Sequence, residues 1–254
     1  MTCRRFHCHL IPLLMAFAVT ACASSNRVDT GFDETNDPIE GFNRQMFAVN
    51  MTLDRYVLRP VAKGYLYVPE PARISVRNFL DNLSSPVTLA NDSLQGEWAR
   101  ASVTSARLVI NSTLGVLGFF DPASRWGFEK HSEDFGQTLG SYGVGAGPYI
   151  YLPILGPSPP RDFFGFGVDS AIDPITHIFD DEPEKAVGVF VVKGIDSRAT
   201  NMNIIDEIER TSVDYYASVR SLYRQNRESE IANGETNLDA LPDIDDLDDE
   251  FYEE

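Results

Sequence analysis

A short apolar run near the start of the chain, preceded by arginines and followed by a cysteine, is the first clear pattern in the sequence. Arg4 and Arg5 come before the mostly apolar residues 10–19. That run is too short to span a bilayer as a permanent helix. A basic segment, a short apolar segment and a small-residue cleavage site are together typical of an export signal. We therefore predict that residues 1–21 are a lipoprotein signal peptide, which lies outside the fold.

The end of this run predicts how the mature protein is anchored. The sequence VTAC occupies residues 19–22, and small residues followed by cysteine are the pattern of a bacterial lipoprotein signal. Lipidation of Cys22 would attach a diacylglycerol and an N-acyl chain, and even two acyl chains give stable membrane anchoring. The alternative is a plain signal peptide followed by an incidental cysteine. Ala23, in place of an aspartate, favours sorting to the outer membrane.

Apolar residues at helical spacing predict an amphipathic helix that begins near Asp37 and ends near Pro60. Asp37 is a candidate N-cap, Pro38 suits the first helical position, and Glu40 completes a capping-box-like start. The apolar positions recur three or four residues apart. They are Ile39, Phe42, Met46, Val49, Leu53 and Tyr56.

Further segments predict a mainly helical body. Two helices are expected from Pro71 to about Leu83 and, after a Ser-Pro start, from 85 to 94. Longer helices are expected over 97–114 and 212–227, the latter with Tyr216, Val219 and Tyr223 on one stripe. Residues 187–192 give the strongest strand signal, although a buried helix is equally compatible with them.

The stretch 136–167 is rich in glycine, tyrosine and proline, which disfavours helix. An extended or looped hairpin is expected there, either as a mobile functional loop or as a rigid connector. Several aromatic residues before and within this stretch are candidates for contact with a membrane interface. The more ordinary interpretation, an aromatic core, is favoured by composition. These residues are Phe119, Phe120, Trp126, Phe128, Phe163, Phe164 and Phe166.

Charge is unevenly distributed along the chain of 254 residues. The formal net charge is −17, and the segment after Arg227 contains twelve acidic residues and no Lys or Arg. Residues 235–254 are therefore expected to be a disordered acidic tail. Residues 22–36 are expected to be a polar linker, which leaves 37–234 as one helical domain. Such an acidic surface argues against a nucleic-acid partner.

The mature chain lacks the usual residues of a catalytic or metal site. The full sequence has three cysteines. Cys3 and Cys8 would be removed with the signal peptide, so Cys22 would be the one cysteine of the mature protein. His131 and His177 are not at metal-ligand spacing, and the neighbourhood of His131 reads as a polar loop. Gly143 to Gly147 is superficially similar to a phosphate-binding loop, but no GK[ST] ending and no helix follow it. The sequence thus predicts no enzyme, no metal and no cofactor.

Several short motifs resemble the MlaA (VacJ) lipoprotein family, with the similarity covering about residues 37–234. The longer ones are DPIEGFNR at 37–44, RPVA at 59–62, VPEPAR at 68–73, NSTLG at 111–115, DFGQTLG at 134–140 and YGVGAGPY at 142–149. Shorter matches are Leu152-Pro153, Arg161-Asp162, Asp214-Tyr215-Tyr216 and Ala232-Asn233-Gly234.

The resemblance implies an outer-membrane lipoprotein of a phospholipid-trafficking system that maintains lipid asymmetry. Members are expected to form a ring of amphipathic helices in the periplasmic leaflet, around a central amphipathic channel and often beside trimeric porins. Mislocalised phospholipids would leave the outer leaflet and pass to a soluble periplasmic carrier. Within the similar motifs, the channel or gate candidates are Tyr142, Gly143, Gly145, Gly147 and Tyr149.

Two other functions are kept as alternatives. The first is a structural envelope lipoprotein that scaffolds porins without transporting lipid. The second is a lipid-hydrolysing enzyme, for which no nucleophile and base are evident in the sequence. Lipid movement itself has a clear physical requirement: apolar tails must avoid water and the phosphate must avoid hydrocarbon.

Overall fold

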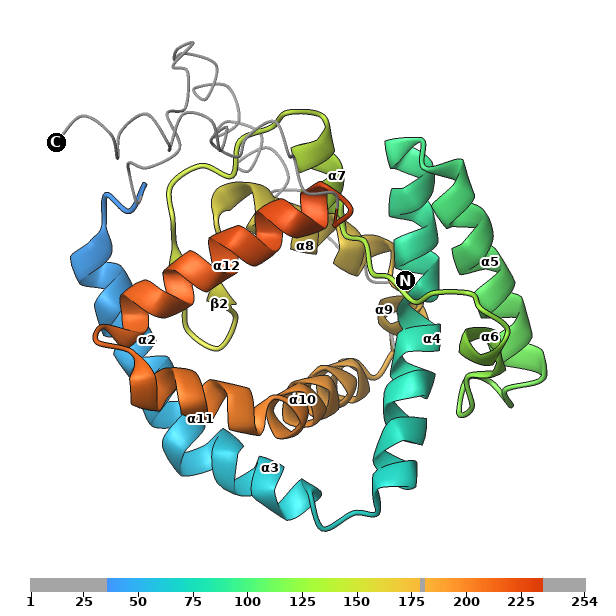
Figure 1. Cartoon of the computed structure of the whole chain (residues 1–254), viewed down its shortest axis with the longest axis horizontal. Helices are drawn as coiled ribbons and strands as arrows, with labels where there is room; N and C mark the ends of the chain where they lie inside the picture. The colour runs from blue at the N-terminus through green and yellow to red at the C-terminus, as the bar shows by residue number, and fades with distance from the viewer. Residues whose placement is uncertain (1–35, 179–180, 235–254) are drawn as a thin grey trace, which may run out of the picture. The chain divides into compact units, whose positions relative to one another are not determined.

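The computed structural model describes residues 36–178 and 181–234. The predicted signal peptide, Cys22, all of the predicted linker except Asn36, and the acidic tail lie outside these residues. The described part is mainly helical, as expected (Figure 1). None of its helices combines the length and the apolar character needed to cross a membrane.

The elements follow one another in this order: α2 (Glu40–Leu53), the π-helix η2 (Asp54–Leu58), α3 (Arg59–Tyr65), α4 (Glu70–Gln95), α5 (Trp98–Thr113), α6 (Pro122–Arg125), α7 (Phe135–Ser141), β1 (Tyr151–Leu152), β2 (Gly156–Pro157), α8 (Pro160–Ile172), α9 (Pro174–Ile178), α10 (Pro183–Thr200), α11 (Met202–Thr211) and α12 (Tyr215–Ile231).

The first predicted helix exists, but both of its predicted ends are wrong. Helical backbone continues from α2 through η2 into α3, so Pro60 does not terminate it. The proline lies inside this continuous helical segment, just after the π-helical turn η2. Asp37 is not the N-cap, because the cap position is Ile39 and no side chain caps α2. The Asp37 carboxylate instead accepts hydrogen bonds from Asn43, Tyr216 and Arg220.

The prediction of two helices over 71–94 is also wrong, because α4 is a single helix with Pro86 inside it. An internal proline costs a helix about 3 kcal/mol. Packing along the length of α4, against α5, α7, α8, α9 and α10, compensates for that cost. The next predicted helix is confirmed as α5, whose buried Ala101 lies among the small residues of that segment.

The glycine-rich stretch contains the expected hairpin, formed by antiparallel pairing of β1 with β2. The exclusion of helix from 136–167 is wrong at both ends, where α7 and the first half of α8 lie. Here glycine permits close helix packing. A Cβ on Gly165 would lie 2.4 Å from the backbone nitrogen of Gly136, so α7 and α8 touch through their backbones.

The strand signal at 187–192 is wrong, because these residues belong to α10. That helix is not buried either: Val187, Phe190, Val191 and Val192 are all exposed. The last predicted helix is confirmed as α12, displaced a few residues toward the C-terminus. Asp214 caps it by accepting from the Ala217 backbone N–H at 3.1 Å.

Contacts between the helices form a closed circuit. The continuous α2–η2–α3 segment packs on α10, which packs on α9 and α4. α4 contacts α7 and α8, and α7 contacts α12. α12 returns to α2, where Phe47 packs edge-on against Tyr216 with ring centroids 5.5 Å apart. The ribbons of these helices can be followed around the circuit in Figure 1.

Many polar residues lie in the interior, beside an aromatic cluster and other buried apolar residues, and many large apolar residues are exposed. The largest side chains that are fully buried are Asn43, Asn91, Asp92 and Thr138. The favoured interpretation of the aromatic residues as a core is therefore wrong, because six of the seven candidates are exposed and Phe128 is half-buried. Phe164, for example, is 55% exposed and Trp126 is 60% exposed.

Candidate functional site

The β hairpin is held against α2 by two asparagine side chains. Asn43 donates to the Tyr149 carbonyl at 2.9 Å and accepts from the Tyr151 N–H at 2.9 Å. Two helical turns later, Asn50 donates to the Leu152 carbonyl at 3.0 Å and accepts from the Ile154 N–H at 2.7 Å. Each amide thus substitutes for a neighbouring strand. These contacts favour the rigid-connector interpretation for residues 149–154.

An aromatic cluster lies beside this attachment. Tyr149, Tyr151 and Tyr216 surround Phe47 and are all buried. Tyr216 donates to Asp37 at 2.5 Å, and the Arg220 guanidinium lies 2.6 Å from the same carboxylate. Burial raises the pKa of Asp37, but these hydrogen bonds outweigh it and hold the pKa below its ordinary value. Asp37 therefore stays ionised and joins the start of α2 to α12.

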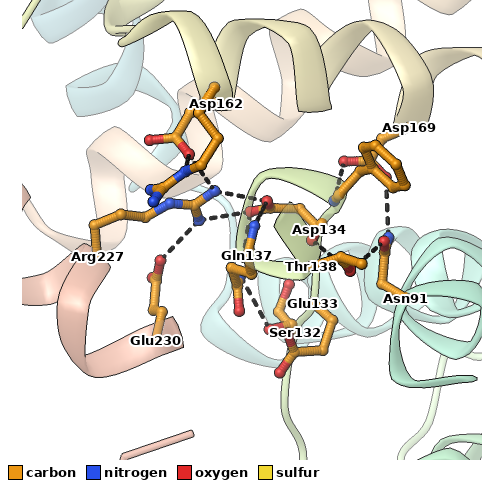
Figure 2. Close-up of polar contacts among 12 residues, drawn as sticks. Asn91, Ser132, Glu133, Asp134, Gln137, Thr138, Asp162, Asp169, Arg227 and Glu230 are labelled. Carbon is orange, nitrogen blue, oxygen red and sulfur yellow. Dashed lines mark hydrogen bonds and ion pairs between the residues drawn. The ribbon is translucent and has the colours of Figure 1, made fainter. Parts of the chain in front are cut away.

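A partly buried ion-pair cluster lies where α7, α8 and α12 meet (Figure 2). Arg227 of α12 lies 2.6 Å from Asp134 and 3.0 Å from Asp162, and its Nη1 lies 3.0 Å from Glu230. Burial raises the pKa values of both aspartates, but hydrogen bonds to arginine, with Tyr223 also bonded to Asp162, hold them below the ordinary range. Asp134 also caps α7 by accepting from the Gln137 N–H. We call Asp134, Asp162 and Arg227 the arginine cluster.

Figure 2 also shows the polar contacts that join this cluster to α4. Thr138 donates to Asn91 at 2.8 Å, and Asn91 donates to Asp169 at 3.0 Å. Glu133 accepts from Gln95 at 2.9 Å and pairs with Arg100 at 2.5 Å. Burial raises the pKa values of Glu133 and Asp169 despite these hydrogen bonds. The centre of the fold is therefore hydrogen-bonded and charged.

The two histidines occupy different settings. His131 lies 3.0 Å from the buried Asp92 carboxylate and 3.1 Å from the Thr104 hydroxyl. His177 lies 2.8 Å from the Ala171 carbonyl oxygen. Asp134, which is close to His131 in the sequence, pairs with Arg227 of the arginine cluster. Among residues 36–178 and 181–234, no group of three His, Cys, Asp or Glu side chains is arranged to hold a metal.

A cavity of ≈310 Å³ lies between residues 145–149, here called the glycine-rich loop, the start of α8 and the last turns of α12. The structure places three of the five predicted channel or gate residues, Gly145, Gly147 and Tyr149, in its wall. Tyr142 is 68% exposed and donates to the Leu94 carbonyl at 2.5 Å. Gly143 has φ +81°, with open space around its Cα. These two do not line the cavity.

Sequence reasoning missed most of the residues that organise this region. Asn43, Asn50 and Arg227 lie in predicted helices and carry no periodic apolar signal. A signal did exist for Asn43 and Asn50, because a seven-residue separation places two amides on one side of a helix. No comparable spacing joins Arg227 to Asp134 and Asp162, which lie on separate helices.

Large apolar side chains are exposed on helices around the whole circuit. On α2 and η2 they include Phe42, Val49, Leu53 and Tyr56, which are four of the residues that gave the first helix its periodicity. On α8 they include Phe163, Phe164 and Phe166, whereas Arg161 and Gly165 of the same helix are buried. Large apolar side chains exposed in this number are typical of a surface that contacts a membrane or a protein partner.

Comparison with known proteins gives consistent results. A family model described as MlaA lipoprotein matches residues 35–230. The "Intermembrane phospholipid transport system lipoprotein MlaA" of Haemophilus influenzae is 38% identical over 240 residues, which cover 92% of this chain and 95% of that protein. The Escherichia coli (strain K12) protein of the same name is 38% identical over 221 residues, or 85% of each chain.

A solved structure described as "Structural basis for maintenance of bacterial outer membrane lipid asymmetry" is also similar. It superposes with a TM-score of 0.70 at 36% sequence identity, covering 77% of this chain and 98% of that one. Sequence and backbone therefore agree over the helical domain.

Proposed function

Because this chain belongs to the MlaA lipoprotein family, we propose that it is an outer-membrane lipoprotein that removes mislocalised phospholipids from the outer leaflet and passes them to a periplasmic carrier. Its action would maintain the lipid asymmetry of the outer membrane. Relatives named as phospholipid-transport lipoproteins and a structural neighbour concerned with lipid asymmetry support this function.

The single observation that carries the proposal is the inverted distribution of side chains. Moving apolar surface into water costs about 25 cal/mol per Å², so the two tails of a phospholipid cannot cross water freely. A phosphate cannot cross hydrocarbon, because burying an unpaired charge is prohibitive. A protein with an apolar exterior and a polar, charged interior separates these two environments. The exposed phenylalanines of α8 and the arginine cluster illustrate the two sides.

We further propose that the closed circuit of helices is a ring lying in the periplasmic leaflet, with an amphipathic channel at its centre. Its exposed apolar side chains would contact acyl chains, and its polar interior would face the headgroup. The contacts that run from α2 through α10 and α4 to α12 support this arrangement. Within it, Tyr142, Gly143, Gly145, Gly147 and Tyr149 are proposed as channel or gate residues.

Partners and anchoring complete the proposal. Trimeric porins would lie beside the ring, and a soluble periplasmic carrier would receive the lipid. The lipid on Cys22 would hold the mature protein at the membrane, with 22–36 as its linker and 235–254 as an acidic tail. Cys22→Ala should leave an unlipidated precursor, which acyl-chain labelling would detect. Unchanged outer-membrane fractionation of this variant would contradict the anchoring role.

Lipid transfer from reconstituted vesicles to the purified carrier tests the function directly. Vesicles that contain the protein should transfer labelled phospholipid to the carrier, and protein-free vesicles should not. In cells, deletion of the gene should raise phospholipid in the outer leaflet and weaken the detergent barrier. Binding to porin without any lipid transfer would support a purely structural role and overturn the proposal.

A further inference from the structure

The cavity beside the glycine-rich loop differs from the chain as a whole in its balance of basic and acidic residues. The chain as a whole has 38 acidic and 21 basic residues, yet the cavity wall contains three arginines and two acidic residues. The arginines are Arg161, Arg224 and Arg227, and the acids are Asp162 and Glu228. Asp162 is already engaged, since Arg161, Arg227 and Tyr223 all hydrogen-bond to it. Arg227 is engaged as well, since Asp134, Asp162 and Glu230 all contact it, so the case for an anionic ligand rests on Arg161 and on the backbone N–H groups near it.

Arg161 is the cation best placed to meet such a ligand. Its side chain is only 6% exposed, which means that it is held in one orientation. Its Nε donates to Asp162 at 2.9 Å and its Nη1 to the Val144 carbonyl at 3.3 Å. Its Nη2 has no acceptor among the described residues. A buried guanidinium with one donor nitrogen still available is well suited to an oxygen anion.

The loop opposite Arg161 supplies neutral donors. The backbone N–H groups of Gly145, Ala146 and Gly147 have no acceptor within residues 36–178 and 181–234. All three residues line the cavity. Gly147 has φ +80°, and successive backbone N–H groups near a left-handed residue commonly form anion-binding concavities. The first turn of α8 also lines the cavity, through Pro159, Arg161 and Asp162.

The remaining wall and the size of the cavity suit a lipid headgroup. A volume of ≈310 Å³ lies at the lower end of small-molecule pockets, which hold about 300–1,000 Å³. Ile231, Pro159 and the ring of Tyr223 add apolar surface beside the arginines. A phosphodiester attached to a glycerol backbone needs both kinds of contact.

We propose that this cavity binds the phosphate group of a phospholipid, with Arg161 as its main charged contact and the N–H groups of residues 145–147 as further donors. The inference rests on the proposed function for the source of its ligand. Free inorganic phosphate shares the recognised chemistry, so the test must separate the two sources.

Gly145 offers a clean variant pair. A Cβ there meets nothing within 4 Å, and its φ lies outside the left-handed region, so a side chain is tolerated. Gly145→Asp places a negative charge in the wall, and Gly145→Asn is its neutral control of the same shape. Glu228→Gln removes a negative charge from the wall and should act in the opposite direction.

Binding is measured by ³¹P NMR titration of the purified full-length protein in a phosphate-free maltoside detergent. The probes are dihexanoylphosphatidylethanolamine and inorganic phosphate, and displacement by dihexanoylglycerol is the phosphate-free arm. Gly145→Asp should weaken binding of the short-chain phospholipid at least about tenfold, because like charges are brought together. Gly145→Asn should change it less than about threefold, and Glu228→Gln should tighten it.

Three results would overturn the assignment. Equal affinities of the Asp and Asn variants would show that charge in this wall is irrelevant. Displacement by dihexanoylglycerol at similar concentration would show that the tails alone are recognised. Inorganic phosphate bound as tightly as the phospholipid would indicate a free-phosphate site. Vesicle-to-carrier transfer by the wild-type protein separates these failures from failure of the proposed function, which only an inactive wild type would show.

Discussion

Two sets of side chains on α8 follow opposite rules. Asp162 pairs with Arg161 and Arg227, away from solvent. Phe163, which lies about half a turn of helix from Arg161, is 49% exposed. In a water-soluble protein the phenylalanines would be buried and the ion pairs would be at the surface. The helix is amphipathic in the usual sense, but its two faces are reversed.

This reversal shows what kind of surroundings the fold fits. An exterior with many exposed phenylalanines and valines is compatible with the leaflet placement that we propose. A charged interior is stable only when every charge is paired. The arginine cluster meets that condition, since Arg227 contacts three carboxylates.

The largest expected effect comes from breaking the charged interior. Arg227→Met would leave Asp134 and Asp162 without their shared partner, which should lower the free energy of unfolding by about 2–4 kcal/mol, because the Asp134 side chain is 38% exposed and Asp162 keeps Arg161. Urea unfolding in detergent measures this change. Arg210→Ala is the matched control, because Arg210 is exposed and, within the part of the chain that the structure describes, pairs only with Glu207, so it should cost less than about 1 kcal/mol. Equal losses in the two variants would refute the importance of the cluster.

Disrupting the close contact between α7 and α8 at Gly136 and Gly165 should give the next largest effect. Gly165→Ala would place a methyl group 2.4 Å from the Gly136 nitrogen and should destabilise the protein by about 1–3 kcal/mol. Gly167→Ala, two residues later on α8, meets nothing within 4 Å and should be neutral or stabilising. Thermal unfolding of both variants checks the contrast. Similar melting temperatures would mean that α7 and α8 separate without cost.

Replacing an exposed phenylalanine of α8 should change membrane binding and leave stability largely unchanged. Phe163→Ser should weaken binding of the unlipidated protein to vesicles by about 1 kcal/mol, roughly fivefold, because half of a phenylalanine side chain loses its apolar surroundings. Vesicle sedimentation measures the partition, and Ser170→Ala on the same helix is the control. An unchanged partition together with lowered stability would place Phe163 in a core.

Acid should affect the charged interior gradually, which is the smallest expected effect. The pKa values of Asp134 and Asp162 are lowered in the folded protein, while an unfolded aspartate titrates near about 3.9. Their contribution to stability is therefore complete above that value and is lost as the pH falls through the folded pKa values. The raised pKa values of Glu133 and Asp169 act in the opposite direction, because protonation relieves their burial.

Unfolding free energies measured between about pH 4 and about pH 2 test the contribution of the two lowered aspartates, with about 1.4 kcal/mol as the scale for each unit of pKa shift. The wild-type protein should lose stability over this interval. Arg227→Met should lose less, because it lacks the cation that lowers both pKa values. Identical slopes for the two proteins would contradict the assignment of the shifts to Arg227.

The sequence predicted helices well where a single element carried the signal. Residues of α5 and α12 were identified from local periodicity, and capping by Asp214 completes the second of these. It failed where the outcome depended on neighbours. Pro86 remains inside α4 because five other helices pack along it, and glycine-rich α7 and α8 form because Gly136 and Gly165 allow them to touch.

The candidate site was predictable only in part, for the same reason. The motif at 142–149 directed attention to Gly145, Gly147 and Tyr149, which the structure places in one cavity wall. The arginines and acids of that wall come from α8 and α12, more than ten residues away in sequence. These residues come together only through the packing of the helices, so no periodic pattern in the sequence predicts their proximity.

By itself, the sequence determined the family and the predominance of helix, because motifs and apolar spacing are local properties of the chain. Only the tertiary structure decided which side of each helix faces inward. Periodicity shows that a helix has two unlike faces, but it does not show whether each face contacts water, lipid or other parts of the protein. In this protein the polar face turned inward, since paired charges at the helix contacts are stable there and the apolar face is suited to a lipid leaflet.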